Sequence, residues 1–177
     1  YTDLITGSAH EVHAPVVYNV AGPWIDRVFK GNKEIPLQPR LNGGTKGSHL
    51  IVDKFPGAPK EVVYYETRTD GRLILVIPWL DKYMLGTTDI RWEKDPDDAR
   101  CDIGELEYLL REVNALIPEA KLKYADVLYT YSGVRPLPYE PDKNESAVTR
   151  THILFDHKSN GLEGLITVVG GKLTTFR

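Results

Sequence analysis

Residues 61–80 read EVVYYETRTDGRLILVIPWL, with a run of β-branched and aromatic residues on either side of Asp70-Gly71. Such residues favour strands. Asp-Gly between two such runs is a strong hairpin signal, because glycine readily adopts the positive φ that tight turns require. The segment therefore predicts an antiparallel hairpin, and it indicates the fold class of the sequence around it.

Strand-like segments continue on both sides of this hairpin. Residues 47–55 (GSHLIVDKF) precede it, and residues 83–90 (YMLGTTDI) and 126–136 (DVLYTYSGVRP) follow it. Strands joined by tight turns pair in antiparallel fashion. We therefore expect one antiparallel sheet in the middle of the chain.

One long helix is predicted between the last two of these strands. Asp102 can cap its first turn together with Glu105, and Pro118 ends it. Apolar side chains recur at helical spacing and so share one face; they are Ile103, Leu106, Leu109, Leu110, Val113, Leu116 and Ile117. We expect this helix to cover one face of the sheet, which gives an α+β fold.

The two ends of the chain differ from the middle. Residues 11–31 predict a short buried strand containing Val16, Val17, Val20 and Ala21, then a Gly22-Pro23 turn and a short helix ending before Gly31. Such a strand–turn–helix unit can bind a cofactor at the carboxyl end of its strand, although an ordinary βα unit has the same pattern. Residues 147–157 and 162–170 predict a second hairpin through Asn160-Gly161. We expect two domains, with the middle one inserted into the other.

Composition excludes several classes of function. The chain has 22 Lys and Arg against 25 Asp and Glu, without a long run of one sign, which argues against general nucleic-acid binding. Cys101 is the single cysteine, so no disulfide framework is expected, and no metal-ligand spacing is present. No apolar stretch reaches membrane-spanning length. The chain begins at Tyr1 in a strand-like segment, so we expect it to be part of a longer protein.

Four residues are candidates for chemistry. His49 lies where a Gly-Ser turn enters a strand, but a hydrogen-bonded histidine on a sheet face is the simpler interpretation. Arg135 stands before Pro136 at a rigid turn and could hold an anion, or it could form a surface salt bridge. Arg150 alternates along a strand and means little alone. Lys172 follows Gly170-Gly171, which allow a ligand to approach the backbone closely. This pattern predicts a cationic, glycine-edged site for a small anion.

Several segments together carry a family resemblance. In order along the chain they are VVYNVAGPWIDRVF (16–29), KGSHLIV (46–52), VIPWLDKYMLGTTDI (76–90), YTYSGVRPL (129–137), AVTRTHIL (147–154) and TVVGGKLTTFR (167–177). They closely resemble the FAD-dependent glycerol-3-phosphate dehydrogenases of the aerobic, respiratory type, which are D-amino-acid-oxidase-like flavoproteins. SGVRPL and GGKLTT are the most specific of these segments.

The resemblance implies a domain division and a set of site residues. Residues 1–31 and 146–177 would be parts of a discontinuous FAD-binding domain, and residues 32–145 would be the substrate-binding domain. His49, Arg135 and Lys172 would be catalytic, and Arg135, Arg150 and Lys172 would bind the substrate phosphate. The residues implied to contact FAD are Ala21, Gly22, Pro23, Trp24, Gly170, Gly171, Lys172, Leu173, Thr174 and Thr175, with the GGKLTT turn facing the flavin ring.

The resemblance also implies the reaction of the parent enzyme. It would oxidise sn-glycerol 3-phosphate to dihydroxyacetone phosphate and pass the electrons to a quinone. It would be cytoplasmic and peripheral on the inner face of the cell membrane. A Gly-x-Gly-x-x-Gly turn for the FAD pyrophosphate is absent from these residues, so we expect the chain alone to be inactive and not to retain FAD. The alternatives are a sister flavoenzyme acting on an amino or 2-hydroxy acid, and a non-catalytic substrate-binding module.

Overall fold

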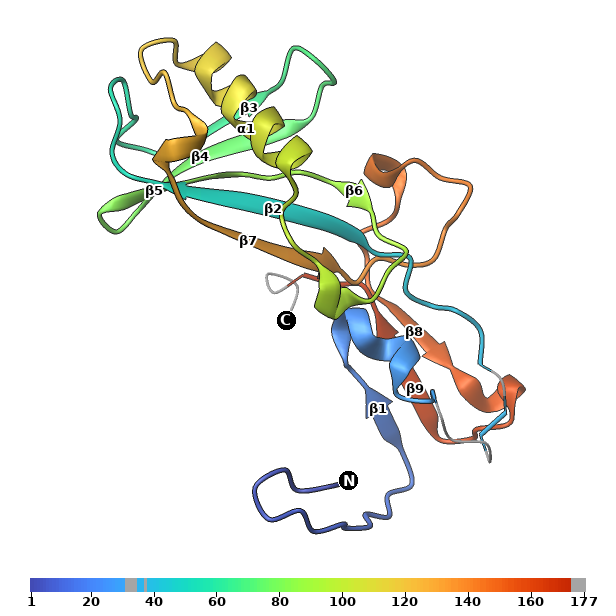
Figure 1. Ribbon diagram of the computed structural model, residues 1–177. Coiled ribbons are helices and arrows are strands. Elements are labelled where there is room, and N and C mark those ends of the chain that lie inside the picture. The colour runs from blue at the N-terminus through green and yellow to red at the C-terminus, as the bar shows by residue number, and fades with distance from the viewer. Residues whose placement is uncertain (31–34, 37, 173–177) are drawn as a thin grey trace.

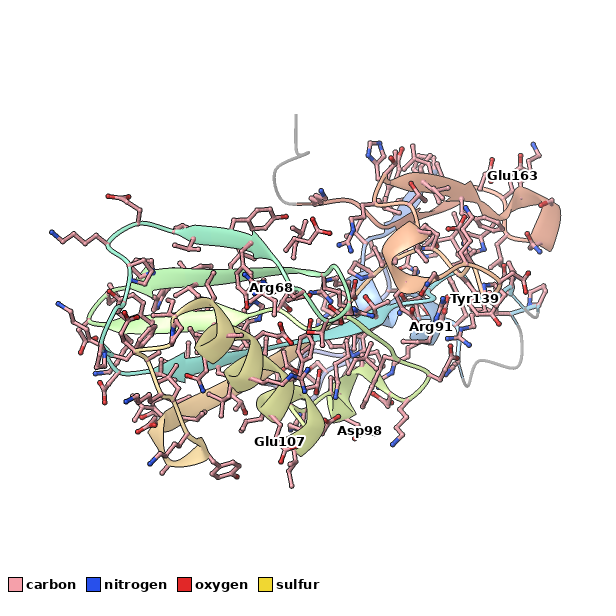
Figure 2. All side chains as sticks on the ribbon, turned by 90° about the horizontal axis from the view of Figure 1, so that it is seen from above. Arg68, Arg91, Asp98, Glu107, Tyr139 and Glu163 are labelled. Carbon is pink, nitrogen blue, oxygen red and sulfur yellow. The ribbon has the colours of Figure 1, made fainter. Side chains whose placement is uncertain are left out.

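The computed structural model describes residues 1–30, 35, 36 and 38–172. It contains two separate sheets, which lie at opposite ends of an elongated molecule (Figure 1). Seen from above in Figure 2, Glu163 marks the end with the small sheet and Glu107 lies on the helix that covers the large one. None of the helices in the described residues is long and apolar enough to cross a lipid bilayer.

The large sheet has six strands and is antiparallel throughout, as predicted. The strands are β2 (Thr45–Val52), β3 (Val63–Glu66), β4 (Leu73–Trp79), β5 (Lys82–Gly86), β6 (Ile90–Arg91) and β7 (Val127–Arg135). β3 and β4 form the hairpin expected from residues 61–80, with Gly71 at a φ of 69° in its turn. β7 runs along one edge of β2, and β5 and β6 share the other edge.

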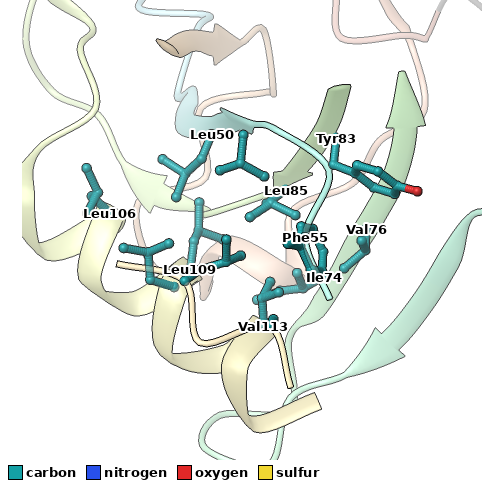
Figure 3. Packing of buried hydrophobic residues seen from close by; sticks show 13 residues of the cluster. Leu50, Phe55, Ile74, Val76, Tyr83, Leu85, Leu106, Leu109 and Val113 are labelled. Atoms are coloured by element: carbon teal, nitrogen blue, oxygen red, sulfur yellow. The ribbon is translucent and has the colours of Figure 1, made fainter. Parts of the chain in front are cut away.

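The predicted long helix is α1, Ile103–Leu116. Its capping box is present: the side chain of Asp102 accepts a hydrogen bond from the Glu105 amide at 3.0 Å, and Glu105 Oε2 accepts one from the Asp102 amide at 3.0 Å. Its apolar side chains pack on one face of the large sheet (Figure 3). The contacts include Leu109 and Val113 with Leu50, Ile74 and Leu85, all fully buried. This layer is the main hydrophobic core.

The small sheet is formed by the two ends of the chain. Its strands are β1 (Val17–Asn19), β9 (Leu165–Val169) and β8 (Ile153–Asp156), in that order. β8 and β9 form the second predicted hairpin, with Gly161 at a φ of 85° after the short 3₁₀ helix His157–Asn160. β1 pairs with β9 in parallel, so the carboxyl ends of these two strands lie at the same edge.

The expectation that the first strand is buried was wrong. Val16, Val17 and Val20 are exposed, and within β1 only Asn19 is buried. Among the described residues β1 pairs only with β9, so it is an edge strand. The helix after it is a 3₁₀ helix, Gly22–Arg27, and Gly31 lies outside the described residues. Three further 3₁₀ turns span Pro96–Asp98, Tyr124–Asp126 and Glu145–Ala147.

The two faces of β2 have different roles because side chains alternate along a strand. Lys46, Ser48, Leu50 and Val52 face α1 and its core. The residues between them, including Gly47 and His49, face the opposite side, where β7 places Tyr131 and Arg135. α1 therefore leaves free the face that carries two of the predicted site residues.

Candidate functional site

Arg135, the last residue of β7, is held by the segment that follows β5. Its Nη1 donates to Asp89 Oδ1 at 3.0 Å, and its Nη2 donates to Thr87 Oγ1 at 3.0 Å and to the Thr88 carbonyl at 3.2 Å. A guanidinium has five N–H donors. Among the described residues these contacts use three of them, so Arg135 is positioned by protein groups and keeps two donors for a ligand.

Asp89 brings two more arginines to the same place. Arg150 Nη2 donates to Asp89 Oδ2 at 3.3 Å, and Arg72 Nη1 donates to the Asp89 carbonyl. We call Arg72, Arg135, Arg150 and Asp89 the arginine cluster. Arg72 also lies 3.4 Å from Asp70, so three guanidinium groups meet two carboxylates, and the group carries a net positive charge. Such a cluster attracts an anion.

Exposure differs between the two predicted arginines. The Arg150 side chain is 41% exposed, against 25% for Arg135. Burial lowers the pKa of the Arg135 guanidinium, and the carboxylate of Asp89 opposes this shift. Arginine nevertheless stays protonated in proteins. Arg150 is therefore the cation of the pair that is more accessible to a ligand.

His49 stacks on Tyr131 with ring centroids 4.7 Å apart and ring planes 4° apart. Its Nδ1 is buried and has no hydrogen-bond partner within the described residues. Burial, and then the charge of Arg135, lowers the pKa of the His49 imidazole from 6.5 to about 4. The neutral ring is therefore the form present at pH 7.

Glycines make room for both side chains. A Cβ on Gly47 would overlap the guanidinium of Arg135, and a Cβ on Gly86 would overlap the His49 ring. Gly47 pairs across the strands with Gly133, and this pair lies between the His49–Tyr131 and Thr45–Arg135 pairs. The guanidinium of Arg135 therefore lies over Gly47, whereas the space next to the Cα of Gly133 is empty of other described atoms within 4 Å.

The predicted glycine turn lies beside the same cluster. Gly170 and Gly171, just after β9, have φ angles of 76° and 88°. A Cβ on Gly170 would lie 3.0 Å from the Thr151 carbonyl oxygen and 3.7 Å from that of Pro136, so this turn packs against the neighbours of both arginines. Lys172 is exposed next to it. Leu173, Thr174 and Thr175 lie outside the described residues.

The second predicted cofactor segment begins at the same edge of the small sheet. Ala21 follows β1 and its amide donates to Asn19 Oδ1 at 3.2 Å, while Gly22 has a φ of 57° and open space around its Cα. Pro23 begins the 3₁₀ helix, and Trp24 Nε1 donates to Asp97 Oδ1 at 2.9 Å. Glycines at the ends of two adjacent parallel strands form an edge that a ligand can approach closely. This edge fits a dinucleotide cofactor such as FAD.

A hollow of about 670 Å³ lies elsewhere and does not include His49 or Arg135. Both arginines that line it have carboxylate partners: Arg27 pairs with Asp95 and Asp97, and Arg40 pairs with Glu93 at 2.6 Å. In the described part of the chain, no three His, Cys, Asp or Glu residues are grouped so that they could hold a metal ion. We therefore place the candidate site at the arginine cluster.

Sequence reasoning missed Arg72, Thr87, Thr88, Asp89 and Tyr131. The segment Thr87–Asp89 was assigned to a strand, although two threonines and an aspartate after an apolar run resemble a polar strand end. Arg72 directly follows the Asp70-Gly71 turn, so it was interpreted only as the start of the second strand of the predicted hairpin. Their roles depend on which strands become neighbours, and the sequence pattern does not specify this.

Comparison with known proteins identifies the class. The family model described as FAD dependent oxidoreductase (DAO) matches residues 2–177. The chain therefore belongs to the FAD dependent oxidoreductase family. Glycine oxidase from Bacillus cereus shares the fold, with a TM-score of 0.53 at 16% identity over 88% of this chain and 36% of that one.

More specific similarity is to glycerol-3-phosphate dehydrogenases, which confirms the resemblance of the sequence. The chain is 44% identical to the Synechocystis glycerol-3-phosphate dehydrogenase over 99% of this chain and 33% of that protein. It is 35% identical to the aerobic glycerol-3-phosphate dehydrogenase of Escherichia coli over 99% and 34%, respectively. The crystal structure of the Bacillus halodurans glycerol-3-phosphate dehydrogenase complexed with FAD matches with a TM-score of 0.79 and 33% identity, covering 99% of this chain and 32% of that one. The chain spans about a third of the length of these relatives.

Proposed function

We propose that this chain forms the substrate-binding part, and two pieces of the FAD-binding part, of an enzyme that oxidises sn-glycerol 3-phosphate to dihydroxyacetone phosphate. The arginine cluster beside a glycine edge is the observation that carries the proposal. A phosphate dianion needs several cations within reach, and guanidinium groups bind phosphate especially well. The names of the relatives supply the particular substrate.

The domain division is part of the proposal. Residues 1–31 and 146–177 would form the returning pieces of the FAD-binding domain, and residues 32–145 would form the substrate-binding domain, an antiparallel sheet covered by α1. The separation of the strands supports this division: β1, β8 and β9 form one sheet, and β2 to β7 form the other. The site would then lie where the two domains meet.

Each candidate residue has a proposed role. Arg150 would hold the phosphate with its accessible donors, and Arg135 would add charge and its two remaining donors. His49 would accept the proton of the C2 hydroxyl at Nε2, since Nδ1 is buried. Ala21 to Trp24 and Gly170 to Lys172 would hold FAD. The positive charge of Lys172 would contact both the edge of the flavin ring and the substrate phosphate. FAD, when bound, accepts the hydrogen that leaves C2 as hydride.

The wider setting of the enzyme is proposed from its relatives. The Escherichia coli relative is called an aerobic glycerol-3-phosphate dehydrogenase, which agrees with electron transfer to a quinone. We infer a cytoplasmic enzyme that associates peripherally with the inner face of the cell membrane. FAD binding and activity would require the rest of the FAD-binding domain, so this chain alone would carry neither.

The test of this function uses an enzyme that contains this chain together with the remaining FAD-binding segments. It should turn over glycerol 3-phosphate with a kcat/KM at least about tenfold higher than that for glycerol, because only the phosphate ester reaches the arginine cluster. Steady-state kinetics with an artificial electron acceptor measures this. A preference for glycine or a 2-hydroxy acid would favour a sister oxidase, and ligand binding without turnover would favour a binding module.

A second prediction concerns the space above Gly47. The Gly47→Ala variant should raise KM for glycerol 3-phosphate about three- to tenfold, because the new methyl group displaces the guanidinium of Arg135 from its place over the strand. Gly133→Ala is the matched control, since a Cβ at this paired position meets no atom within 4 Å. Equal KM values in the two variants would show that substrate binding does not depend on the position of the Arg135 guanidinium.

A further inference from the structure

A buried polar network lies directly beneath the arginine cluster, on the α1 side of β2. Glu105 is 2% exposed, and its Oε1 accepts hydrogen bonds from Thr88 Oγ1 at 2.6 Å and Ser48 Oγ at 2.9 Å. Its Oε2 accepts from the Asp102 amide and lies 2.7 Å from Lys46 Nζ, and Lys46 is itself 2% exposed. This is a fully partnered buried ion pair.

The capping box of α1 does not explain this arrangement. A glutamate at this helix position can bond the cap amide from solvent, so capping does not require a buried carboxylate or a lysine beside it. Burying two charges costs free energy that their attraction often fails to recover. Lys46 also donates to the Arg100 carbonyl at 2.7 Å and to Asp102 Oδ2 at 3.2 Å, and it lies over the Trp92 ring at 4.9 Å. Lys46 and Glu105 are both buried, whereas Asp102 is largely exposed. Such a costly pair points to a role beyond helix stability.

Thr88 joins this network to the arginine cluster. Its Oγ1 donates to Glu105 and accepts from the Ser48 amide at 2.9 Å, so the side chain is fixed on the α1 side of the sheet. Its carbonyl accepts from Arg135 Nη2 on the opposite side at 3.2 Å. Its neighbours Thr87 and Asp89 bind the same guanidinium. Thr88 therefore contacts groups on both sides of the sheet. Its hydroxyl binds the buried carboxylate of Glu105, and its carbonyl binds Arg135.

We propose that Glu105 is a positioning residue, which acts through Thr88 to fix the segment Thr87–Asp89 and thereby the geometry of Arg135 and Arg150. The inference rests on the proposed function for its kinetic consequence, whereas its structural part concerns only the positions of the two arginines. Glu105 is buried on the α1 side of the sheet and does not touch the substrate. It fixes the position of Thr87–Asp89, whose oxygen atoms accept hydrogen bonds from the guanidinium groups of Arg135 and Arg150.

Kinetic variants test the proposal in the FAD-loaded enzyme. Thr88→Val removes the hydroxyl but no charge, and it should raise KM for glycerol 3-phosphate about three- to tenfold with kcat changed less than about threefold. Thr88→Ser keeps the hydroxyl and should restore KM. Glu105→Gln should raise KM as Thr88→Val does. Unchanged KM in Thr88→Val would overturn the proposal even if Glu105→Gln does not fold.

Glu112→Gln is the matched control. Glu112 is also buried on α1, but its partners are Thr69 Oγ1 and Arg111, not the segment Thr87–Asp89. Glu112→Gln should lower the melting temperature while KM stays the same. If Glu112→Gln raises KM as much as Glu105→Gln does, the effect is a general consequence of destabilising α1 and the proposal fails.

A readout without substrate separates this proposal from the proposed function. In ¹⁵N NMR spectra of the 177-residue chain, the Arg135 Nε–H signal should be sharp in the wild type and in Glu112→Gln, and broadened in Thr88→Val. An enzyme inactive toward glycerol 3-phosphate, with this NMR pattern intact, would overturn the function and support the positioning role. A sharp Arg135 signal in Thr88→Val would overturn the positioning role whatever the enzyme oxidises.

Discussion

Replacing His49 with alanine should slow the oxidation of glycerol 3-phosphate by the FAD-loaded enzyme about 10²–10⁴-fold, the usual contribution of a general base. The ring stacks on Tyr131 over Gly86, and its neutral form can accept a proton at Nε2. Stopped-flow measurement of flavin bleaching at saturating substrate reports this rate. A stable His49→Ala enzyme with a normal rate would exclude His49 as the base.

The pH dependence separates a base from a merely orienting group. Because the pKa of His49 is lowered to about 4, the free enzyme should hold the ring neutral above about pH 5 and lose activity through this group only below that. His49→Gln keeps a hydrogen-bonding amide but cannot accept the proton. It should be nearly as slow as His49→Ala if His49 is the base, and nearly as fast as the wild type if His49 only orients the substrate.

The same shift has a consequence for folding stability. The imidazole binds its proton at about pH 6.5 in the unfolded chain and only near pH 4 in the folded one. The unfolded state therefore binds more protons in this window, and stability falls as the pH drops from about 6.5 to about 4. His49→Gln should lose less stability over this range than the wild type, as melting curves at each pH would show.

Replacing Arg135 with alanine should raise KM for glycerol 3-phosphate roughly 10- to 100-fold, as expected for losing a charge-assisted hydrogen bond to phosphate worth about 1.5–3 kcal/mol. The variant also leaves Asp89, Thr87 and the Thr88 carbonyl without their shared donor. Arg135→Lys should restore only part of the affinity, because an ammonium group cannot reach all three acceptors at once.

The matched variant for Arg135 is Arg150→Ala. Arg150 is more exposed and has one contact with Asp89, so its loss should raise KM with little effect on melting temperature. Arg135→Ala should lower the melting temperature as well. A normal KM in Arg135→Ala, despite lowered stability, would make Arg135 a structural residue and leave the phosphate to Arg150.

Much of the fold could be predicted from local patterns. The two hairpins, α1 and its capping box depend on residues close in sequence, and all were confirmed. The burial of β1 was predicted wrongly, because valines favour a strand whether or not another layer covers it. Whether β1 is covered depends on the packing around it, which its own residues do not reveal.

The candidate site was predicted in part. Arg135 and Arg150 meet at Asp89, the glycine turn packs beside Thr151, and the charge of Arg135 acts on His49. The roles of these residues stay predictions. The sequence did not predict the hydrogen bonds from the Arg135 guanidinium to Thr87–Asp89. It did not predict the low pKa of His49 either. Both depend on contacts across β2, where residues distant in sequence become neighbours.

The pairing of β2 with β7 also leads to an expectation about the order in which the chain folds. Thr45 lies opposite Arg135, so this ladder closes a long loop that contains β3, β4, β5, β6 and α1. Closing a long loop costs entropy, whereas the hairpins and the helix gain their contacts locally. The local elements should therefore form early and the β2–β7 ladder late. Arg135 reaches Asp89 only in that last step, so the anion-binding geometry and the completed sheet arise together.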